Sequence, residues 1–484
     1  MANDISGTPL IAGRNRRVML ALMTTAYTLN FIDRTIIASI GQAIKTDLKI
    51  TDTQLGLLGG LYFALLYTIL GIPLARLAER YSRVNIISVA IFVWSGFTAL
   101  CGTAASYATL AAYRFGVGVG EAGLSPPAHS LVSDYYPPAK RASALSIYSL
   151  GVPIGTMIGA VAGGWLAQNY SWRVAFIALG LPGVLLALAI KLMVREPVRG
   201  GQEATPPPPR PPYSLGGDLR EIGSVIRSMF GNVTLRNMML GITLASFAGY
   251  GGGAFIQPYW ARAFGLGYAQ IGLITGLIGG ASQGIGVLLG GFASDRLAKR
   301  GAAMWYGLVP AIGIALAYPF VLLIYTADSW QAAALWFMVP GALSYTYMGP
   351  TYGVVQNAFP PIRRATATAV LFFVLNLIAL GFGPPLTGWL IDHLGAFHHA
   401  NPATPGLLPA LGALFSADGS AFAAACPGGT GAVAGSAADT ACRAAVRLAT
   451  RQGVLIAYAV GLWASLHYLL AALSLRRRGM PQAV

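Results

Sequence analysis

Long apolar segments are the feature that most constrains the fold of this chain. A helix that crosses a bilayer needs about 20 mostly apolar residues, and twelve segments meet this condition. They are 17–41, 54–77, 84–104, 107–130, 141–167, 171–194, 235–262, 269–294, 302–326, 330–354, 363–391 and 452–475. Because the chain is also 55% hydrophobic and only 10% charged, we predict an all-α polytopic membrane protein with twelve transmembrane helices.

The gap between the sixth and seventh segments divides the chain into two halves. It covers residues 195–234 and is rich in proline, as linkers often are. We therefore predict six-helix bundles at 17–194 and 235–475, short tails at 1–16 and 476–484, and a long outer loop at 392–451.

The two halves also repeat short motifs in the same order. Gln54-Leu-Gly opens the second segment, and Gln270-Ile-Gly opens the eighth, 216 residues later. Tyr136-Pro-Pro precedes the fifth segment, and Phe359-Pro-Pro precedes the eleventh. A duplicated six-helix unit with a binding site between the halves is the architecture of one large class of transporters.

The basic residues predict the topology. The formal net charge is +16, and most Lys and Arg residues fall in the segments that are cytoplasmic if the N-terminus is cytoplasmic. This bias is typical of membrane topology, whereas a nucleic-acid-binding protein would gather its basic residues on a soluble face. We expect both termini in the cytoplasm, the inner membrane of a bacterium as the location, and no nucleic-acid partner.

Charged residues lie inside two of the apolar segments. Asp33 and Arg34 interrupt the first segment, and Arg114 and Glu121 lie seven residues apart, on one helical face, in the fourth. Each such charge costs about 2.5–3.5 kcal/mol near the centre of a membrane helix, so ionisable residues there usually have a function. We predict that these four residues form the polar centre of the protein.

Asp33 is the main candidate for a residue that binds and releases a proton, because burial and a nearby arginine act on its protonation in opposite directions. Glu121 is the second candidate, and we expect it to be the more hydrated acid, since Pro126-Pro127 follows closely and interrupts helical hydrogen bonding. A static pair of Asp33 with an arginine, holding the first half together, is the structural alternative.

Arg34 and Arg114 have two open interpretations. A guanidinium suits the planar, bidentate recognition of phosphate or carboxylate, so both could bind an anionic headgroup. Each could equally be the counter-ion of Asp33 or Glu121.

The second half contributes no acid to the predicted polar centre. Its inner surface is expected to use aromatic and amide side chains, which suit the apolar part of an amphiphile. Membrane-interface belts and core packing are the alternative role for any one of them. The candidates are Tyr250, Gln257, Tyr259, Tyr345, Tyr347, Tyr352, Gln356 and Asn376.

Several motifs resemble those of the major facilitator superfamily. Glu79-Arg80-x-x-Arg83 follows the second segment like the superfamily's signature loop, and Asp295-Arg296 follows the eighth as a weaker copy. The resemblance implies two bundles that rock against each other. It also implies that these five charged residues gate the cytoplasmic side, although ordinary topology charge is the alternative.

The first and fourth segments resemble the Spinster family more narrowly. Asn30-Phe-Ile-Asp33-Arg34 and Gly120-Glu121-Ala carry this resemblance, which adds Asn30 to the charge-pairing group. The anion–cation symporter family, with a similar Asn-x-x-Asp-Arg start, is the runner-up. Spinster resemblance implies a proton-coupled secondary transporter of an amphipathic lipid or lipid-like anion, such as a lysophospholipid or sphingoid phosphate.

Other functions are alternatives to this one. The same fold could move a small organic anion or a drug, and a membrane sensor or membrane enzyme belongs to another class. The sequence shows no nucleophile–base pair and no nucleotide-binding loop, so we do not expect an enzyme. We also expect a monomer whose partner is its substrate.

Cysteine and histidine residues complete the sequence-based expectations. Cys426 and Cys442 lie in the predicted outer loop, where an oxidising compartment would permit a disulfide, and two free thiols are the alternative. The histidines show no spacing typical of metal ligands, so we expect no metal site. We also expect no cofactor, with a proton as the coupling ion.

Overall fold

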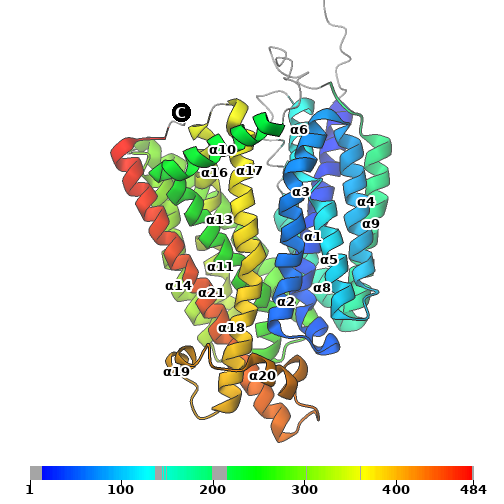
Figure 1. Cartoon of the computed structure of the whole chain (residues 1–484), viewed down its shortest axis with the longest axis vertical. Helices are drawn as coiled ribbons and strands as arrows, with labels where there is room; N and C mark the ends of the chain where they lie inside the picture. The colour runs from blue at the N-terminus through cyan, green and yellow to red at the C-terminus, as the bar shows by residue number, and fades with distance from the viewer. Residues whose placement is uncertain are drawn as a thin grey trace, which may run out of the picture.

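The computed structural model describes residues 13–136, 144, 147–148, 150–198, 215–300, 302–359 and 361–481, and within these residues it consists of helices without strands. The helices form two bundles that lie side by side (Figure 1). Within the described residues, eight helices are long and apolar enough to cross a membrane. Several of the remaining segments are helices broken by a turn, and together these elements match the predicted twelve-helix fold.

The N-terminal bundle follows the first six predicted segments. A break at Gly60 divides the second segment into two helices, and a turn after Glu121 divides the fourth. The helices are α1 (Gly13–Leu48), α2 (Asp52–Gly59), α3 (Leu61–Arg80), α4 (Arg83–Cys101), α5 (Tyr107–Glu121), α6 (Ser125–Tyr135), α8 (Gly151–Asn169) and α9 (Trp172–Met193).

The C-terminal bundle contains helices interrupted by π and 3-10 turns, which often mark functional positions. Its elements are α11 (Val233–Phe264), α12 (Tyr268–Leu273), η1 (Ile274–Gly279), α13 (Gly280–Arg300), α14 (Trp305–Thr326), α15 (Trp330–Ser344), η2 (Tyr345–Tyr347), α16 (Met348–Ala358), α17 (Pro361–Leu375), η3 (Asn376–Leu380), α18 (Gly381–Ala400) and α21 (Ala437–Arg478). The segments η1 and η3 are the π turns.

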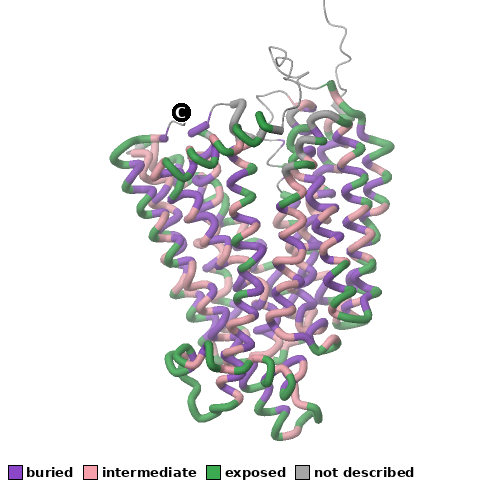
Figure 2. Tube along the Cα trace, in the orientation of Figure 1, coloured by how far each residue is buried: buried purple, intermediate pink, exposed green. Residues whose placement is uncertain are grey.

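The surface of the bundles fits a membrane rather than water. Figure 2 shows buried residues along the inside of each bundle and exposed residues along its outside. Many of the exposed side chains are large and apolar, including Leu185, Leu288 and Phe292. A helix surface of this kind is stable when lipid chains cover it.

Helices occupy both ends of the predicted outer loop, residues 392–451. The helix α18 continues to Ala400, and α21 begins at Ala437, where the Ser436 side chain caps it and an alanine-rich stretch favours helix. We call residues 401–436 the lobe. It contains α19 (Leu407–Gly412), α20 (Gly419–Ala425) and η4 (Pro427–Gly429).

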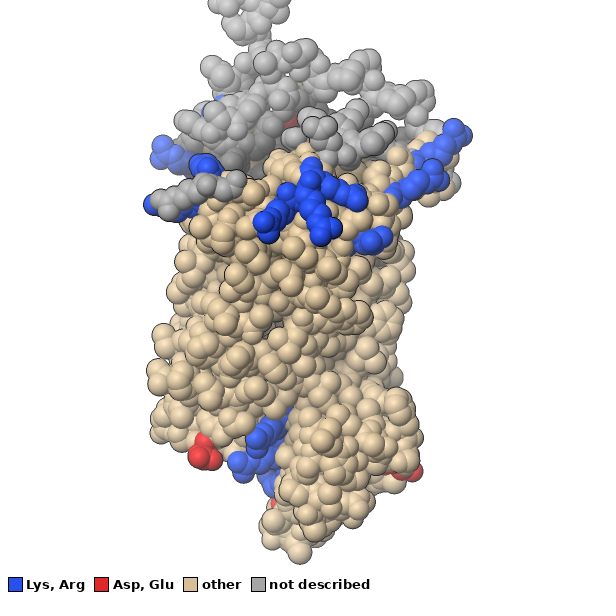
Figure 3. All heavy atoms as spheres, turned by 90° about the vertical axis from the view of Figure 1, so that its left-hand side faces the viewer, with Lys and Arg blue, Asp and Glu red and all other residues tan. Residues whose placement is uncertain are grey.

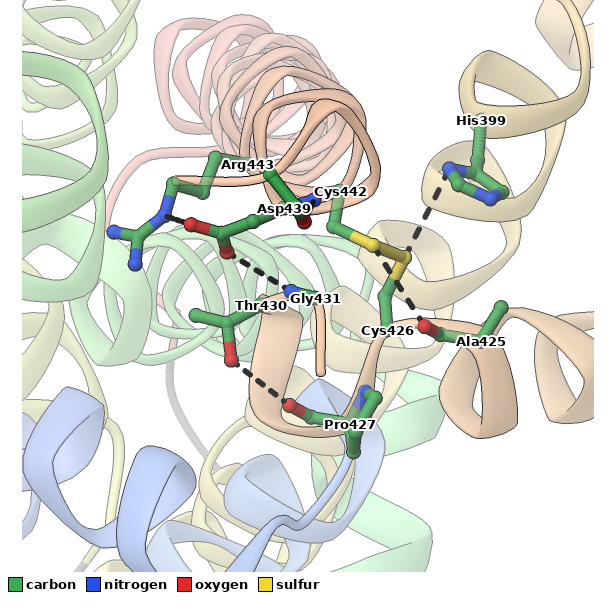
Figure 4. Close-up of a disulfide and its surroundings, with 10 residues drawn as sticks. His399, Ala425, Cys426, Pro427, Thr430, Gly431, Asp439, Cys442 and Arg443 are labelled. Atoms are coloured by element: carbon green, nitrogen blue, oxygen red, sulfur yellow. Dashed lines mark hydrogen bonds and ion pairs between the residues drawn. A yellow bond between two sulfur atoms is a disulfide. The ribbon is translucent and has the colours of Figure 1, made fainter. Parts of the chain in front are cut away.

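A disulfide joins the lobe to α21. It links Cys426 to Cys442, with the two Cα atoms 5.6 Å apart, and the Nδ1 atom of His399 lies 3.8 Å from the Cys426 sulfur (Figure 4). We call the end of the molecule that carries the lobe the lobe end, and the opposite end, where the chain terminates, the terminal end (Figure 1).

One further helix lies inside the predicted linker. The helix α10 (Leu215–Gly231) packs on the C-terminal bundle through the buried side chains of Val225 and Met229. It lies at the terminal end, across the ends of neighbouring helices (Figure 1). The proline-rich part of the linker falls outside the described residues.

The two bundles meet through glycines near the lobe end. A Cβ atom built on Gly388 of α18 would overlap the carbonyl oxygen of Asp52, and one built on Gly272 of α12 would overlap that of Ala160 on α8. The helix backbones can therefore touch directly. Toward the terminal end the two bundles diverge (Figure 1).

Candidate substrate and proton site

Asp33 lies buried on α1 and faces α4. Its Oδ2 atom accepts a hydrogen bond from the hydroxyl of Thr98, and its Oδ1 atom has no partner among the described residues. A carboxyl oxygen without a donor is where a proton can reside without breaking an existing bond. Thr98 is a contributor that the sequence analysis missed.

Glu121 lies at the end of α5 and is paired with Arg34 of α1. The Arg34 Nε donates to Glu121 Oε2 at 3.0 Å, and the Glu121 side chain is buried with its Oε1 atom unpartnered in the described structure. The expectation of a hydrated Glu121 is therefore wrong. The turn between α5 and α6 packs against α4, with Gly120 and Gly123 against its backbone and side chains, and Glu121 itself is 1% exposed.

Arg34 lies among aromatic rings. Its guanidinium carbon is 4.7 Å from the ring centre of Tyr67, 5.0 Å from that of Phe63 and 5.3 Å from that of Phe31. Cation–π contacts of this kind stabilise a partly desolvated cation. The Arg34 side chain is 16% exposed, and Tyr250 of the C-terminal bundle lies within electrostatic reach of it. Arg34 is thus accessible where the two bundles face each other.

Arg114 is more enclosed than Arg34. Its Nε donates to the Leu58 carbonyl oxygen at 3.3 Å, its guanidinium lies 5.4 Å from the centre of the Phe63 ring, and its Nη1 has no described partner. It acts electrostatically on both Asp33 and Glu121. This placement favours the counter-ion interpretation for Arg114.

Asn30 lies about one turn before Asp33 and Arg34 on α1. It is buried, lies within reach of Glu121, and its Oδ1 atom lacks a described partner. The cluster of Asn30, Asp33, Arg34, Arg114 and Glu121, which we call the central cluster, therefore has no net charge when its acids are ionised. It keeps unpaired polar atoms on four of its side chains.

The aromatic candidates of the second half fall into two groups. Tyr250, Tyr345 and Tyr352 are half-buried and lie close enough to interact electrostatically. Because Tyr250 is also within electrostatic reach of Arg34, this group connects the C-terminal bundle to the central cluster.

Three of the other candidates of the second half have partners inside the C-terminal bundle. Gln257 donates to Thr275 at 2.8 Å, and Tyr259 donates to the Tyr325 carbonyl oxygen at 3.3 Å. Tyr347 is buried against Ser246 and Tyr468, Asn376 is buried at the start of η3, and the side chain of Gln356 falls outside the description. The contacts of Gln257, Tyr259 and Tyr347 are those of packing residues within the C-terminal bundle.

The predicted gating residues with described contacts, Arg83 and Asp295, pair within their own bundles. Arg83 donates to Glu196 at 2.7 Å and is also paired with Asp134, both in the N-terminal bundle. Asp295 accepts from the Tyr306 hydroxyl at 2.9 Å within the C-terminal bundle.

The remaining gating residues are placed as follows. Arg296 is exposed, and the side chains of Glu79 and Arg80 fall outside the description. The Glu196 carboxylate lies beyond the end of α9, outside the membrane-spanning segments. Burial opposes its ionisation, but the Val84 amide and the Arg83 guanidinium stabilise the charge, so the pKa of Glu196 is lowered.

A charge network joins the two bundles at the lobe end instead. The Asp52 carboxylate of α2 accepts from Lys45 Nζ at 2.6 Å and from Arg262 of α11 at 2.6 and 3.1 Å. The exposed fractions of these side chains are 1% for Asp52, 3% for Lys45 and 6% for Arg262. Arg262 also donates to Gln42 at 2.8 Å and to Thr450 at 2.6 Å.

Asp392 of α18 adds a second connection between the bundles. Its carboxylate accepts from the backbone N–H groups of Asp52 and Thr53 at 2.9 and 2.8 Å, so it caps the N-terminus of a helix from the other half. We call Lys45, Asp52, Arg262 and Asp392 the lobe-end latch. The latch was not predicted, although its charges lie in the loop before the second segment, at the end of the seventh and directly after the eleventh.

The cysteine–histidine group is not a metal site in this structure. The side-chain ligand atoms of His399, Cys426 and Cys442 lie within 4.8 Å of one another, but the two sulfur atoms are bonded to each other. Neither sulfur is then a thiolate, the form that binds metal ions.

The family follows from a comparison with known proteins. Residues 23–384 match the family described as Major Facilitator Superfamily. The chain belongs to this superfamily. Its members are transporters rather than enzymes, and the long apolar helices identify an integral membrane protein.

Within the superfamily the chain is Spinster-like. It is 30% identical to a solved bacterial homologue of the human lysosomal transporter Spinster, in an inward-facing, unoccupied conformation, with a TM-score of 0.80 and coverage of 96% of this chain and 98% of that one. It is 26% identical to the sphingosine-1-phosphate transporter SPNS2 of Danio rerio, covering 80% of this chain and 77% of the relative.

Other relatives have different names. An MFS-type efflux pump of Mycolicibacterium smegmatis is 29% identical over 76% of this chain and 82% of its own length. Relatives at 24% identity include proteins named as a probable L-galactonate transporter and a hexuronate transporter. The comparisons therefore establish a Spinster-like transporter and leave the substrate class to the chemistry of the site.

Proposed function

We propose that this transporter moves an amphipathic anion across the membrane by alternating access, coupled to protons. The observation that carries the proposal is the central cluster, where one accessible arginine is held by a buried acid and surrounded by aromatic rings. This arrangement offers a guanidinium to an anionic headgroup and apolar surface to the chain attached to it. The sphingosine-1-phosphate transporter among the relatives is consistent with such a substrate.

The site supports proton coupling through competition for Arg34. A headgroup that binds this guanidinium replaces Glu121 as its partner. A buried carboxylate that loses its counter-ion is best neutralised by a proton, because an unpaired charge is costly in a water-poor site. Asp33, with one oxygen free of partners, is the second position where a proton is held. Substrate binding and proton uptake would then depend on each other.

The cycle also needs a change in how the bundles meet. We place the terminal end, with the start of α1, the end of α21 and most basic residues, in the cytoplasm of a bacterium with the protein in its inner membrane. The lobe-end latch then closes the outer side, and the bundles diverge toward the inner side (Figure 1). Opening requires Asp52 and Arg262 to separate, while the residues at the terminal end come together. We propose that one chain performs this cycle as a monomer.

The substrate class is tested by uptake into proteoliposomes. Tritiated sphingosine-1-phosphate and lysophosphatidylglycerol represent amphipathic anions, and glucuronate represents a small organic anion. We expect uptake of an amphiphile that Arg34→Gln reduces at least tenfold, since the variant cannot pair with the headgroup. Arg173→Gln is the matched control, because Arg173 pairs with Asp47 at 2.8 Å on the surface of the same bundle.

Two outcomes would change the proposal. Uptake of glucuronate without uptake of the amphiphiles would assign the protein to the small organic anions named among its relatives. Amphiphile uptake that survives Arg34→Gln would remove this arginine from the headgroup site.

A further inference from the structure

An arginine stripe runs along α21 at the lobe end. Arg443, Arg447 and Arg451 are spaced four residues apart, so they lie on one face of the helix. Arg443 pairs with Asp439 at 2.9 Å, as Figure 4 shows. Among the described residues, Arg447 and Arg451 have no acid within ion-pair distance. Two cations at this end therefore lack a counter-ion.

The lobe end carries a basic recess. Figure 3 shows Lys and Arg residues in a hollow there, between the membrane body and the lobe, and the stripe lies at this end of α21. Arg447 and Arg451 lie within electrostatic reach of Tyr259, at the lobe end of α11. Low-dielectric walls around charges of one sign concentrate their field, which attracts anions.

The lobe that forms one wall of this recess exposes large apolar side chains. Leu408 of α19 is 82% exposed and Phe415 is 90% exposed, and Leu411 lies between them in sequence. Phe415 also contacts the ring of Trp389, with centroids 5.8 Å apart. The lobe end thus offers both exposed apolar surface and unpaired cations, which correspond to the two parts of an amphipathic anion.

The recess also leads to the lobe-end latch. Thr450, the residue before Arg451, accepts a hydrogen bond from Arg262 at 2.6 Å, and Arg262 holds Asp52. An anion that moved inward from Arg451 would next meet Arg262. There it would compete with Asp52 for the guanidinium that closes the two bundles.

We propose that this recess is a second binding site, in which Arg447 and Arg451 hold the phosphate of a single-chain amphiphile and the lobe holds its acyl chain. A guanidinium pairs with phosphate in a bidentate geometry. Two guanidinium groups carry more positive charge than a zwitterionic headgroup, which has no net charge, can neutralise. The site receives the substrate outside the latch, or delivers it there. This inference rests on the proposed function for its choice of ligand.

The test measures binding of tritiated 1-oleoyl lysophosphatidic acid to the full chain in nanodiscs of phosphatidylcholine. All proteins carry Arg34→Gln, which removes the central headgroup contact and leaves the recess intact. We expect the double substitution Arg447→Ala with Arg451→Ala to weaken binding at least tenfold, as loss of charge-assisted hydrogen bonds does. The matched control is Arg477→Ala with Arg478→Ala, which removes the same charge from the other end of α21.

The outcomes separate the alternatives. Equal binding by the double variant and its parent overturns the site, and an equal loss in the control variant assigns the effect to bulk charge and also overturns it. Competition by inorganic phosphate at the same concentration shows a site for free anions and overturns the role of the acyl chain.

Transport distinguishes this inference from the proposed function. If wild-type protein carries no amphiphile in proteoliposomes while the double variant still loses binding, the recess stands and the proposed function fails. If wild-type protein transports the amphiphile while the double variant binds it as tightly as its parent, the proposed function stands and the recess fails.

Discussion

The lobe-end latch yields the most quantitative prediction. Asp52→Asn removes one acid and leaves Lys45 and Arg262 at 3% and 6% exposure when the lobe end is closed. Removing one partner of a buried ion pair costs about 3–5 kcal/mol. When the lobe end opens, water reaches both cations and this cost disappears. With tenfold for each 1.4 kcal/mol, the closed state loses roughly a hundredfold to a few thousandfold in its ratio to the open state.

Distances between spin labels measure this change directly. Labels at Ala105, in the turn between α4 and α5, and at Thr326, at the end of α14, report the separation of the two bundles at the lobe end, and both positions are exposed. We expect wild-type protein to show mainly the short distance and Asp52→Asn to gain a longer one. Asp47→Asn is the matched control, because Asp47 pairs with Arg173 of the same N-terminal bundle, on its surface. An unchanged distance distribution in Asp52→Asn would refute the latch.

Three further perturbations test separate parts of the structure. Gly388→Ala places a methyl group against the Asp52 carbonyl oxygen, so the same labels should report opening without any change of charge; a closed lobe end would contradict it. Reduction of the lobe disulfide, which spans 16 residues and contributes about 3 kcal/mol by the chain-entropy model, should speed proteolysis of the lobe but leave the melting of the bundles unchanged. Glu196→Gln should cost about 2 kcal/mol in unfolding free energy at pH 7 because Arg83 loses a charged acceptor. Since the pKa of Glu196 is lowered, wild-type protein should lose this advantage progressively as the pH falls below about 4.3, the usual glutamate value, and a difference that stays constant through that fall would count against it.

The sequence predicted the fold well because hydropathy and repeats are local or periodic signals. Each predicted segment needed only enough apolar residues in a row. The boundaries of the segments are harder to predict where the composition is misleading. The alanine-rich start of α21 falls in the predicted outer loop, yet it forms helix from Ala437. Breaks such as the one at Gly60 depend on packing against Leu380 and Pro385 of the other half, which no local pattern contains.

The central cluster was predictable in membership but not in pairing. Asp33, Arg34, Arg114 and Glu121 stand out because charges are rare in apolar segments. The bond between Arg34 and Glu121 joins residues 87 positions apart, and several pairings satisfied the same charges. The latch was harder to predict, since Arg262 and Asp52 are 210 positions apart and look like ordinary loop charges in the sequence.

Internal pH in proteoliposomes tests the central claim most directly. Addition of an amphiphile that the protein carries should move protons together with the substrate. Asp33→Asn and Glu121→Gln, each made alone, should abolish that proton movement. Any substrate movement that remains should be uncoupled from protons. Proton movement that survives both substitutions would contradict the role of the central cluster. Substrate movement without protons in wild-type protein would contradict proton coupling and leave Arg34 and Glu121 as a binding pair alone.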